Sequence, residues 1–213
     1  MLSSQLLKSL TRTHPVVPLV LYGPVILALA AFGVQRVGVL IAIALMAAGY
    51  LTWTLTEYWV HRLVFHLQPR GPRSGYFVWI IHGVHHAHPN DPRRVVALPM
   101  ASLPIGAAAA ALFWLVLPGA SWLPFAAGWG GGYLGYDLLH VYLHVGRPRT
   151  PLLRWLRGRH LRHHFADARG DFGVSAPYWD YVFGTSLPAH TPRRKQRDTL
   201  TTQGCGVVRG GSG

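Results

Sequence analysis

Ten of the thirteen histidines fall into four short clusters whose spacing suits metal binding. The clusters read HRLVFH (61–66), HGVHH (82–86), HVYLH (140–144) and HLRHH (160–164). In the last three, histidines three or four residues apart share one face of a helix. Neutral imidazole binds iron, zinc and copper, and ten imidazoles exceed what one ion takes, so we expect two metals with about five ligands each. The candidate ligands are His61, His66, His82, His85, His86, His140, His144, His160, His163 and His164.

The first cluster has an unusual spacing. His61 and His66 are five residues apart, which is about 140° around an ideal helix. Two interpretations follow. Either the two histidines serve different metals, or the helix is distorted between them.

Carboxylates are too scarce for the Glu-rich di-metal site of ferritin-like bundles. We expect Asp91 and Asp137 to hold ligand histidines through the second ring N–H. Asp137 lies three residues before His140, on the same helix face. The histidines outside the clusters are assigned to the surface or to the lining of the site; they are His14, His88 and His190.

The elements that must position these clusters are apolar. Hydrophobic residues make up 50% of the 213 residues and charged residues 13%, against about 25% charged in ordinary soluble domains. Each apolar run is long enough for a bilayer core of about 30 Å. We therefore predict an all-α integral membrane protein with four transmembrane helices in two hairpins, and a helical cap carrying the histidines. The runs are Val16–Val34, Val39–Trp59, Leu98–Leu117 and Phe125–Leu143.

The basic residues predict which side of the membrane the cap faces. The net charge is +13, and Lys and Arg concentrate near the N-terminus, in 60–97 and beyond 144. The positive-inside rule then places both termini and the cap in the cytoplasm, in a bacterial inner membrane or the endoplasmic reticulum. This distribution argues against a nucleic-acid partner. We expect the membrane domain to span residues 1–190 and a disordered tail to span 191–213, where the single cysteine, Cys205, excludes cysteine-ligated clusters.

The order HxxxxH, HxxHH, HxxxH, HxxHH resembles the fatty acid hydroxylase and sterol desaturase superfamily of membrane di-metal oxygenases. The flanking stretches HGVHHAHPND, YDLLHVYLH and FGVSAPYWDYVFGT are similar to the fatty acid 2-hydroxylase branch, over about residues 50–186. The resemblance implies that the ten clustered histidines bind two iron ions, with zinc possible in a purified form. It also implies hydroxylation of a lipid acyl chain at C2 with O2. In the family the third motif often continues as a histidine pair, whereas here Val145 follows.

The implied reaction also needs an electron donor and residues that bind the lipid substrate. Some family members carry a fused cytochrome b5 domain, but about fifteen residues precede the first apolar run. We therefore expect a separate donor, cytochrome b5-like or ferredoxin-type. The substrate candidates are an aromatic pair for the entrance or the membrane interface, and polar groups for the lipid head; they are Tyr76, Phe77, Arg93, Arg94 and Tyr178.

Other functions compete with this interpretation. Within the superfamily, a sterol or carotenoid hydroxylase or desaturase is the nearest alternative. A membrane zinc hydrolase would show HExxH, but the only glutamate is Glu57. A haem-binding electron carrier would place histidine pairs at matched depths inside the apolar runs, whereas these clusters crowd at one end.

Overall fold

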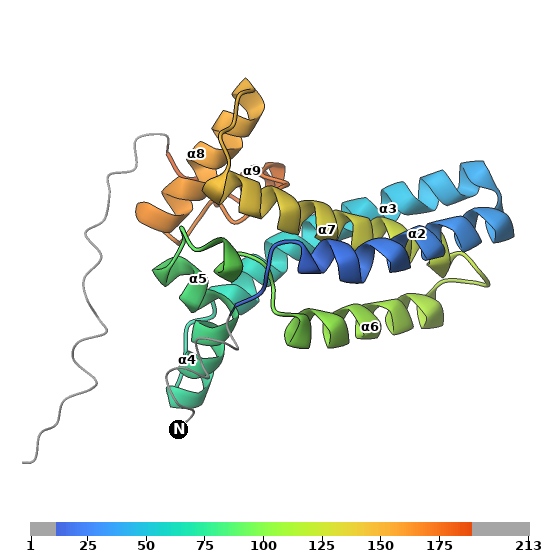
Figure 1. Ribbon diagram of the computed structural model, residues 1–213, viewed down its shortest axis with the longest axis horizontal. Helices are drawn as coiled ribbons and strands as arrows, with labels where there is room; N and C mark the ends of the chain where they lie inside the picture. Colours follow the sequence, from blue (N-terminus) through green and yellow to red (C-terminus); the bar gives the residue numbers. More distant parts are fainter. Residues whose placement is uncertain (1–11, 189–213) are drawn as a thin grey trace, which may run out of the picture.

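The computed structural model describes residues 12–188, which form an all-helical fold without strands. Figure 1 shows an elongated bundle of helices with a smaller group of short helices packed at one end. The bundle consists of α2 (Val17–Val37), α3 (Val39–Trp59), α6 (Pro99–Val116) and α7 (Trp122–Val145). The predicted all-α class is therefore confirmed.

One longer helix, α8, and six short elements at the end of the bundle form the cap. Two of them are π-helical, with one extra residue per hydrogen-bonded turn, and one is a 3-10 helix. The cap elements are η1 (π, Val60–Phe65), α4 (Pro72–Val78), η2 (π, Trp79–Gly83), α5 (Val84–Ala87), η3 (3-10, Pro92–Arg94), α8 (Pro151–Phe165) and α9 (Tyr178–Val182).

Three helical segments are long and apolar enough to cross a membrane: Val17–Val37, Val39–Phe65 and Pro99–Val116. Large apolar side chains stand exposed along them, as expected for surfaces that face lipid. The fourth long helix, α7, is not among these candidates. Its sequence includes five glycines, two histidines and Asp137, which lower its hydropathy. The sequence predicts four spans. By length and composition the structure supplies three candidates, so the fourth stays a prediction.

Two helix ends differ from the sequence prediction. The first predicted run ends at Val34, but α2 continues to Val37 and the chain reverses at Gly38, whose φ of 82° suits glycine. The fourth predicted run begins at Phe125, but α7 already begins at Trp122. Pro124 fits there since the first turn of a helix needs no amide donor from it.

Helices α3 and α7 cross with almost no space between their backbones. A Cβ added at Gly128 would overlap the backbone of Met46, and one at Gly49 would overlap Phe125. At Gly132 the neighbour is the Trp53 side chain, 2.7 Å away. Small residues permit such close approach in apolar surroundings, so Gly49, Gly128 and Gly132 pack α3 against α7.

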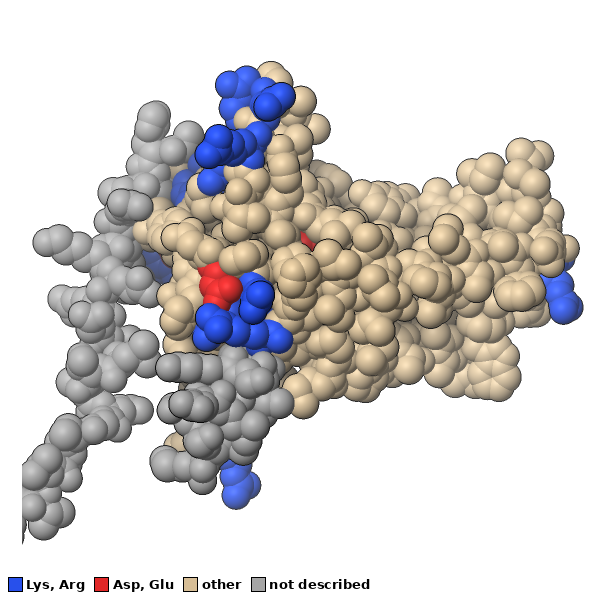
Figure 2. Space-filling view, viewed as in Figure 1, with Lys and Arg blue, Asp and Glu red and all other residues tan. Residues whose placement is uncertain are grey.

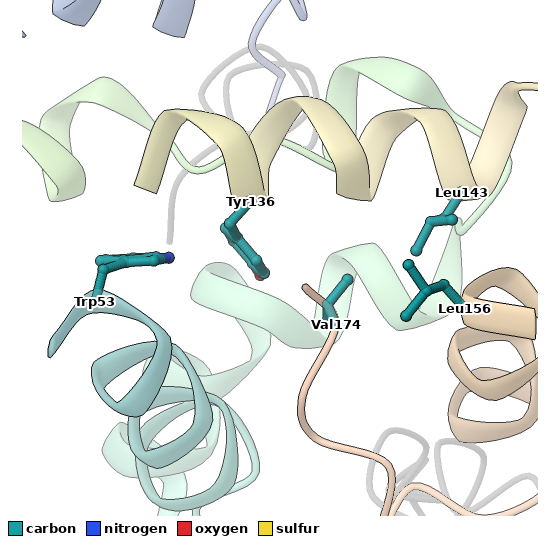
Figure 3. Close-up of a cluster of buried hydrophobic side chains, with 5 residues drawn as sticks. All are labelled: Trp53, Tyr136, Leu143, Leu156 and Val174. Carbon is teal, nitrogen blue, oxygen red and sulfur yellow. The ribbon is translucent and has the colours of Figure 1, made fainter. Parts of the chain in front are cut away.

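The core lies where the bundle meets the cap. A buried cluster joins α3, α7, α8 and the segment before α9 (Figure 3); its members are Trp53, Tyr136, Leu143, Leu156 and Val174. Figure 2 shows that the visible Lys and Arg side chains gather at the cap end, apart from a small patch at the far end of the bundle. The apolar bundle and the charged cap are therefore distinct zones.

Candidate metal centre

All ten predicted histidines meet at the junction between bundle and cap, in two groups of five whose ligand atoms lie within 4.8 Å of one another. The partition matches the expected two metals with about five ligands each. Site A consists of His61, His66, His82, His86 and His163. Site B consists of His85, His140, His144, His160 and His164.

Each HxxHH motif supplies both sites. In the segment 82–86, the first and last histidines, His82 and His86, join site A, whereas His85 joins site B. In α8 the assignment is reversed, since His163 joins site A while the histidines on either side of it in the motif join site B. Residues four apart project together, and the residue between them points about 100° away. One motif therefore places ligands on both metals, and the motifs hold the two sites adjacent.

The spacing of five in the first cluster is explained by a distorted helix. Residues Val60–Phe65 are π-helical, and the His66 amide donates to the His61 carbonyl at 3.1 Å. That i+5 to i bond places residues five apart almost one above the other. His61 and His66 consequently face the same site, and of the two interpretations the distorted helix is the correct one.

The histidine groups pass a test of chemical fit for metal ions. Several ring nitrogens are buried without a hydrogen-bond partner. This arrangement is costly unless a metal ion accepts their lone pairs. Among them are the Nε2 atoms of His61, His66, His140 and His163. Imidazoles are suitable donors for iron and zinc.

Spacing between rings points the same way. The Nε2 atoms of His82 and His86 are 2.9 Å apart, those of His85 and His164 are 3.0 Å apart, and those of His144 and His160 are 2.7 Å apart. Two nitrogens at right angles around an ion, each about 2.0–2.1 Å from it, would be about 3 Å apart. Both sites thus approach the geometry of a ligand shell.

Backbone carbonyls fix two rings of site A. His61 Nδ1 lies 2.5 Å from the Phe172 carbonyl oxygen, and His163 Nδ1 lies 2.7 Å from that of Gly170. A carbonyl only accepts, so Nδ1 carries the proton and donates. The Nε2 lone pair of each ring is then free to point into site A.

The cap histidines are held in the neutral form that binds metal. Burial is the largest cause, and it lowers the pKa of His66 to about 3 and of His163 to about 4. Burial, reinforced by neighbouring imidazoles, also holds the pKa of four others well below the usual range; these are His82, His85, His86 and His160. His164 behaves in the same way. These rings therefore offer lone pairs at neutral pH.

The two predicted helper carboxylates contact other partners. Asp91 accepts from Arg12 at 2.9 Å, from Arg94 at 3.2 Å and from the Arg93 amide at 3.1 Å, so it caps η3 and does not orient a histidine. Asp137 is buried and accepts from the Tyr133 hydroxyl at 3.2 Å. The other Asp137 oxygen and both ring nitrogens of His140 are buried without a hydrogen-bond partner, so Asp137 makes no hydrogen bond to that ring.

The candidate substrate residues lie on three different elements of the cap, α4, η3 and α9. Tyr76 and Phe77 on α4 are exposed, as is Arg93 on η3, whereas Arg94 is partly buried and paired with Asp91. Tyr178 is 44% exposed and its hydroxyl donates to Thr54 at 2.8 Å.

Two of the three histidines outside the clusters, His14 and His88, belong to neither site. His14 and His88 are exposed. His190 and the proposed tail, 191–213, lie outside the described residues.

Sequence reasoning missed a set of buried charged residues beside site A. They are Glu57, Arg159, Asp171 and Asp180, all with at most 4% exposure. One signal was available, because Glu57 is the only glutamate and lies in an apolar run, where a carboxylate is expensive without a dedicated partner.

These features define an all-helical, membrane-type protein with two groups of histidines, each of which could hold a metal ion. The fatty acid hydroxylase family matches residues 46–185, and the chain belongs to that family. It is 38% identical over 141 residues to a dihydroceramide fatty acyl 2-hydroxylase of Arabidopsis thaliana, covering 66% of this chain and 60% of the relative. It is 41% identical over 150 residues to the fatty acid 2-hydroxylase of Macaca fascicularis, covering 68% of this chain and 40% of the relative. The resemblance to the 2-hydroxylase branch is therefore confirmed.

A solved structure agrees with this assignment. The hydroxylase domain of full-length scs7p superposes with a TM-score of 0.84 at 32% identity, covering 91% of this chain and 74% of that one. The chain spans 60% and 40% of the lengths of the two curated relatives just described.

Proposed function

We propose that this protein is a membrane-bound di-metal oxygenase that hydroxylates a lipid acyl chain at C2. The observation that carries the proposal is the pair of five-histidine groups in a member of the fatty acid hydroxylase family. Relatives named fatty acid 2-hydroxylase and dihydroceramide fatty acyl 2-hydroxylase support the acyl substrate and the position.

The ten histidines are the proposed ligands of two iron ions, five at each site. When bound, the iron pair supplies an oxidant made from O2 and two electrons, strong enough for an unactivated C–H bond. The chain's own contribution is a set of neutral imidazoles that adds no negative charge. Zinc would occupy the same ligands without redox chemistry, so zinc in a purified sample is compatible with this proposal.

The lipid is proposed to lie with its head at the cap and its tail along the bundle. In this proposal the exposed Arg93 and the partly exposed Tyr178 contact a polar head group, and the exposed Tyr76 and Phe77 line the approach from the membrane interface. The acyl carbons nearest the carbonyl would then be the ones closest to the histidines. Sequestering the reaction at the buried junction keeps bulk water away from it.

The proposed topology has four spans, with α7 as the fourth, and the cap in the cytoplasm. The support is the gathering of basic side chains at the cap end. In a Cys205→Ser background, Arg36→Cys and Ser121→Cys should react with an impermeant maleimide from the outside, and Arg73→Cys from the cytoplasm alone. Labelling of either far-end position from the cytoplasm alone would contradict the orientation.

Electrons are proposed to come from a separate donor protein, cytochrome b5-like or ferredoxin-type. Among residues 12–188, the two histidine groups are the candidate metal clusters, and both are assigned here to the proposed oxygenase site. The membrane domain itself is proposed to extend over residues 1–190.

Expression in a host without 2-hydroxy lipids tests the function. Hydrolysed fatty acids should contain 2-hydroxy acids carrying ¹⁸O when the cells grow under ¹⁸O2. Appearance of the label only in sterols or carotenoids would assign the protein to the alternative substrates of the superfamily. Absence of label from every lipid, with the electron donor supplied, would reject the oxygenase.

A further inference from the structure

Residues 170–175, between α8 and α9, form a loop that lies against site A; we call it the brace loop. Its Gly170 and Phe172 carbonyls accept the hydrogen bonds from His163 and His61. Both of these rings belong to site A. In site B, by contrast, no ring of the described structure donates to a backbone carbonyl, and the Nδ1 atoms of all five rings are buried without partners.

A single buried carboxylate holds the middle of the brace loop. Asp180, which has no exposed surface, accepts from the Phe172 amide at 2.8 Å and from the Gly173 amide at 2.9 Å. Its two oxygens also accept from the Thr185 hydroxyl at 2.7 Å and from Arg159 at 3.3 Å. Because both oxygens act as acceptors, the site requires a carboxylate rather than an amide.

Two ion pairs tie the brace loop to α8, the helix that carries His163. Asp171 pairs with Arg159 at 2.6 Å and with Arg162 at 2.7 Å, both on α8, which also carries His163. Asp171 has a left-handed φ of 56°, a conformation that Asp tolerates but that needs surrounding contacts to persist.

On the other side, Glu57 lies one helical turn before His61. It accepts from the Ser175 amide at 2.8 Å and makes a shorter hydrogen bond with the Ser175 hydroxyl. The brace loop is thus anchored to α3 and α8, the two helices that lead into its two histidines.

Packing prevents the brace loop from sliding. Val174, 2% exposed, points into the cluster between α7 and α8 (Figure 3). A Cβ at Gly173 would overlap the Ala176 carbonyl, and one at Gly170 would overlap that of Thr185. The carbonyls that hold the two rings therefore have little freedom to move.

We propose that the brace loop sets the tautomer and orientation of His61 and His163, and that Asp180 is the positioning residue that holds the loop. Asp180 then controls metal affinity at site A but not at site B. This inference deepens the proposed function, because it rests on both histidine groups binding metal. Partners that orient metal-bound histidines typically account for about 10–100-fold in metal affinity.

The test measures zinc binding by Asp180→Asn, whose side chain has nearly the same volume. Oδ1 accepts from the Phe172 amide and Oδ2 from the Gly173 amide, so whichever oxygen the NH2 of Asn replaces, one amide of the brace loop loses its acceptor. At graded chelator concentrations the purified wild-type chain should hold two zinc ions. Asp180→Asn should lose one of these ions at a chelator concentration about 10–100-fold lower than the wild type requires. Thr54→Val is the control, since it removes a buried hydroxyl that accepts from Tyr178 and Trp179 on α9 and makes no hydrogen bond to the brace loop.

Double variants identify the site that is lost. Adding His140→Ala to Asp180→Asn should remove the remaining zinc, whereas adding His61→Ala should leave it in place. Retention of both ions by Asp180→Asn, or equal weakening of both, would overturn the proposal. If Asp180→Asn aggregates, Ser175→Ala replaces it, because it removes the hydroxyl that ties the brace loop to Glu57. An unchanged zinc titration then overturns the proposal, and loss of one zinc ion at a lower chelator concentration supports it.

The outcomes separate the two proposals. A wild-type chain that binds two zinc ions but yields no 2-hydroxy lipid with iron and a donor contradicts the hydroxylase assignment and leaves the brace loop standing. A working hydroxylase whose Asp180→Asn variant keeps both sites intact contradicts the brace loop alone.

Discussion

Sites A and B contain the same number of imidazoles, but different kinds of structure hold them. In site B, four of the five histidines form i, i+4 pairs on α7 and α8, two long and regular helices. In site A, His61, His66 and His82 lie on or directly after π-helical segments, and the brace loop fixes two rings. Regular helix geometry thus suffices for one site, whereas the other depends on distorted helices and a loop distant in sequence.

This difference predicts how each site fails. Site B should respond to changes in how α7 and α8 pack, because its ligands move with those helices. Site A should respond to residues that hold the brace loop, even those that touch no histidine. Variants that separate these responses are the most informative.

The largest effect is expected from adjacent histidines that serve different sites. His163→Ala and His164→Ala should each lose one metal ion and lower hydroxylation at least about 100-fold, since each variant leaves a site one ligand short. The double variant His163→Ala/His164→Ala should retain neither ion, whereas His163→Ala/His61→Ala should retain one. Metal analysis of chelator-washed protein measures this.

His14→Ala is the matched control, because His14 is exposed and belongs to neither site. Its metal content and activity should equal those of the wild type. Loss of the same single ion in His163→Ala and His164→Ala, with the second ion unaffected by their combination, would contradict the partition into sites A and B.

The same contrast explains what the sequence could predict. The spacings in 140–144 and 160–164 are helical, so the paired ligands of site B follow from periodicity alone. The π-helix that aligns His61 with His66 depends on one inserted residue per turn, which pattern analysis left as one of two alternatives. The role of Asp180 could not be predicted, since it depends on a tertiary contact with amides seven and eight residues away.

Composition alone marks three of the four long helices as membrane spans and leaves out α7. α7 is the most buried of the long helices, and its glycines and histidines serve packing and metal binding. Selection for those contacts reduces its apolar character, so composition alone marks it weakly.

Glu57→Ala should mainly damage site A. Loss of the carboxylate leaves the Ser175 amide and hydroxyl without their buried acceptor, which costs about 1–3 kcal/mol. Zinc affinity at site A should fall by about 10-fold or more through the brace loop. Glu57→Gln is the control, because its amide oxygen still accepts and its NH2 donates to the hydroxyl. Equal weakening of site B in Glu57→Ala would show that the helix end, and not the loop, was disturbed.

Gly128→Ala should affect both sites together, in contrast to Glu57→Ala. The new methyl would overlap the Met46 backbone and separate α3 from α7, which lead into sites A and B respectively. Overpacking of this kind costs about 1–3 kcal/mol, visible as a lower unfolding temperature in detergent. Gly131→Ala is the control, since its Cβ meets nothing within 4 Å. A normal unfolding temperature for Gly128→Ala would mean that the helices separate without cost.

The smallest effect concerns Val145, where the family often has a second histidine. Val145 is 49% exposed at the end of α7, while the preceding His144 is buried in site B. Five histidines already converge there, and a side chain at 145 points about 100° away from that of His144. Val145→His should therefore leave two metal ions bound and change stability by less than about 0.5 kcal/mol, the usual range for a surface substitution. An increase in zinc affinity at site B would show instead that the fifth ligand of site B is weakly held and that a histidine at 145 can replace it.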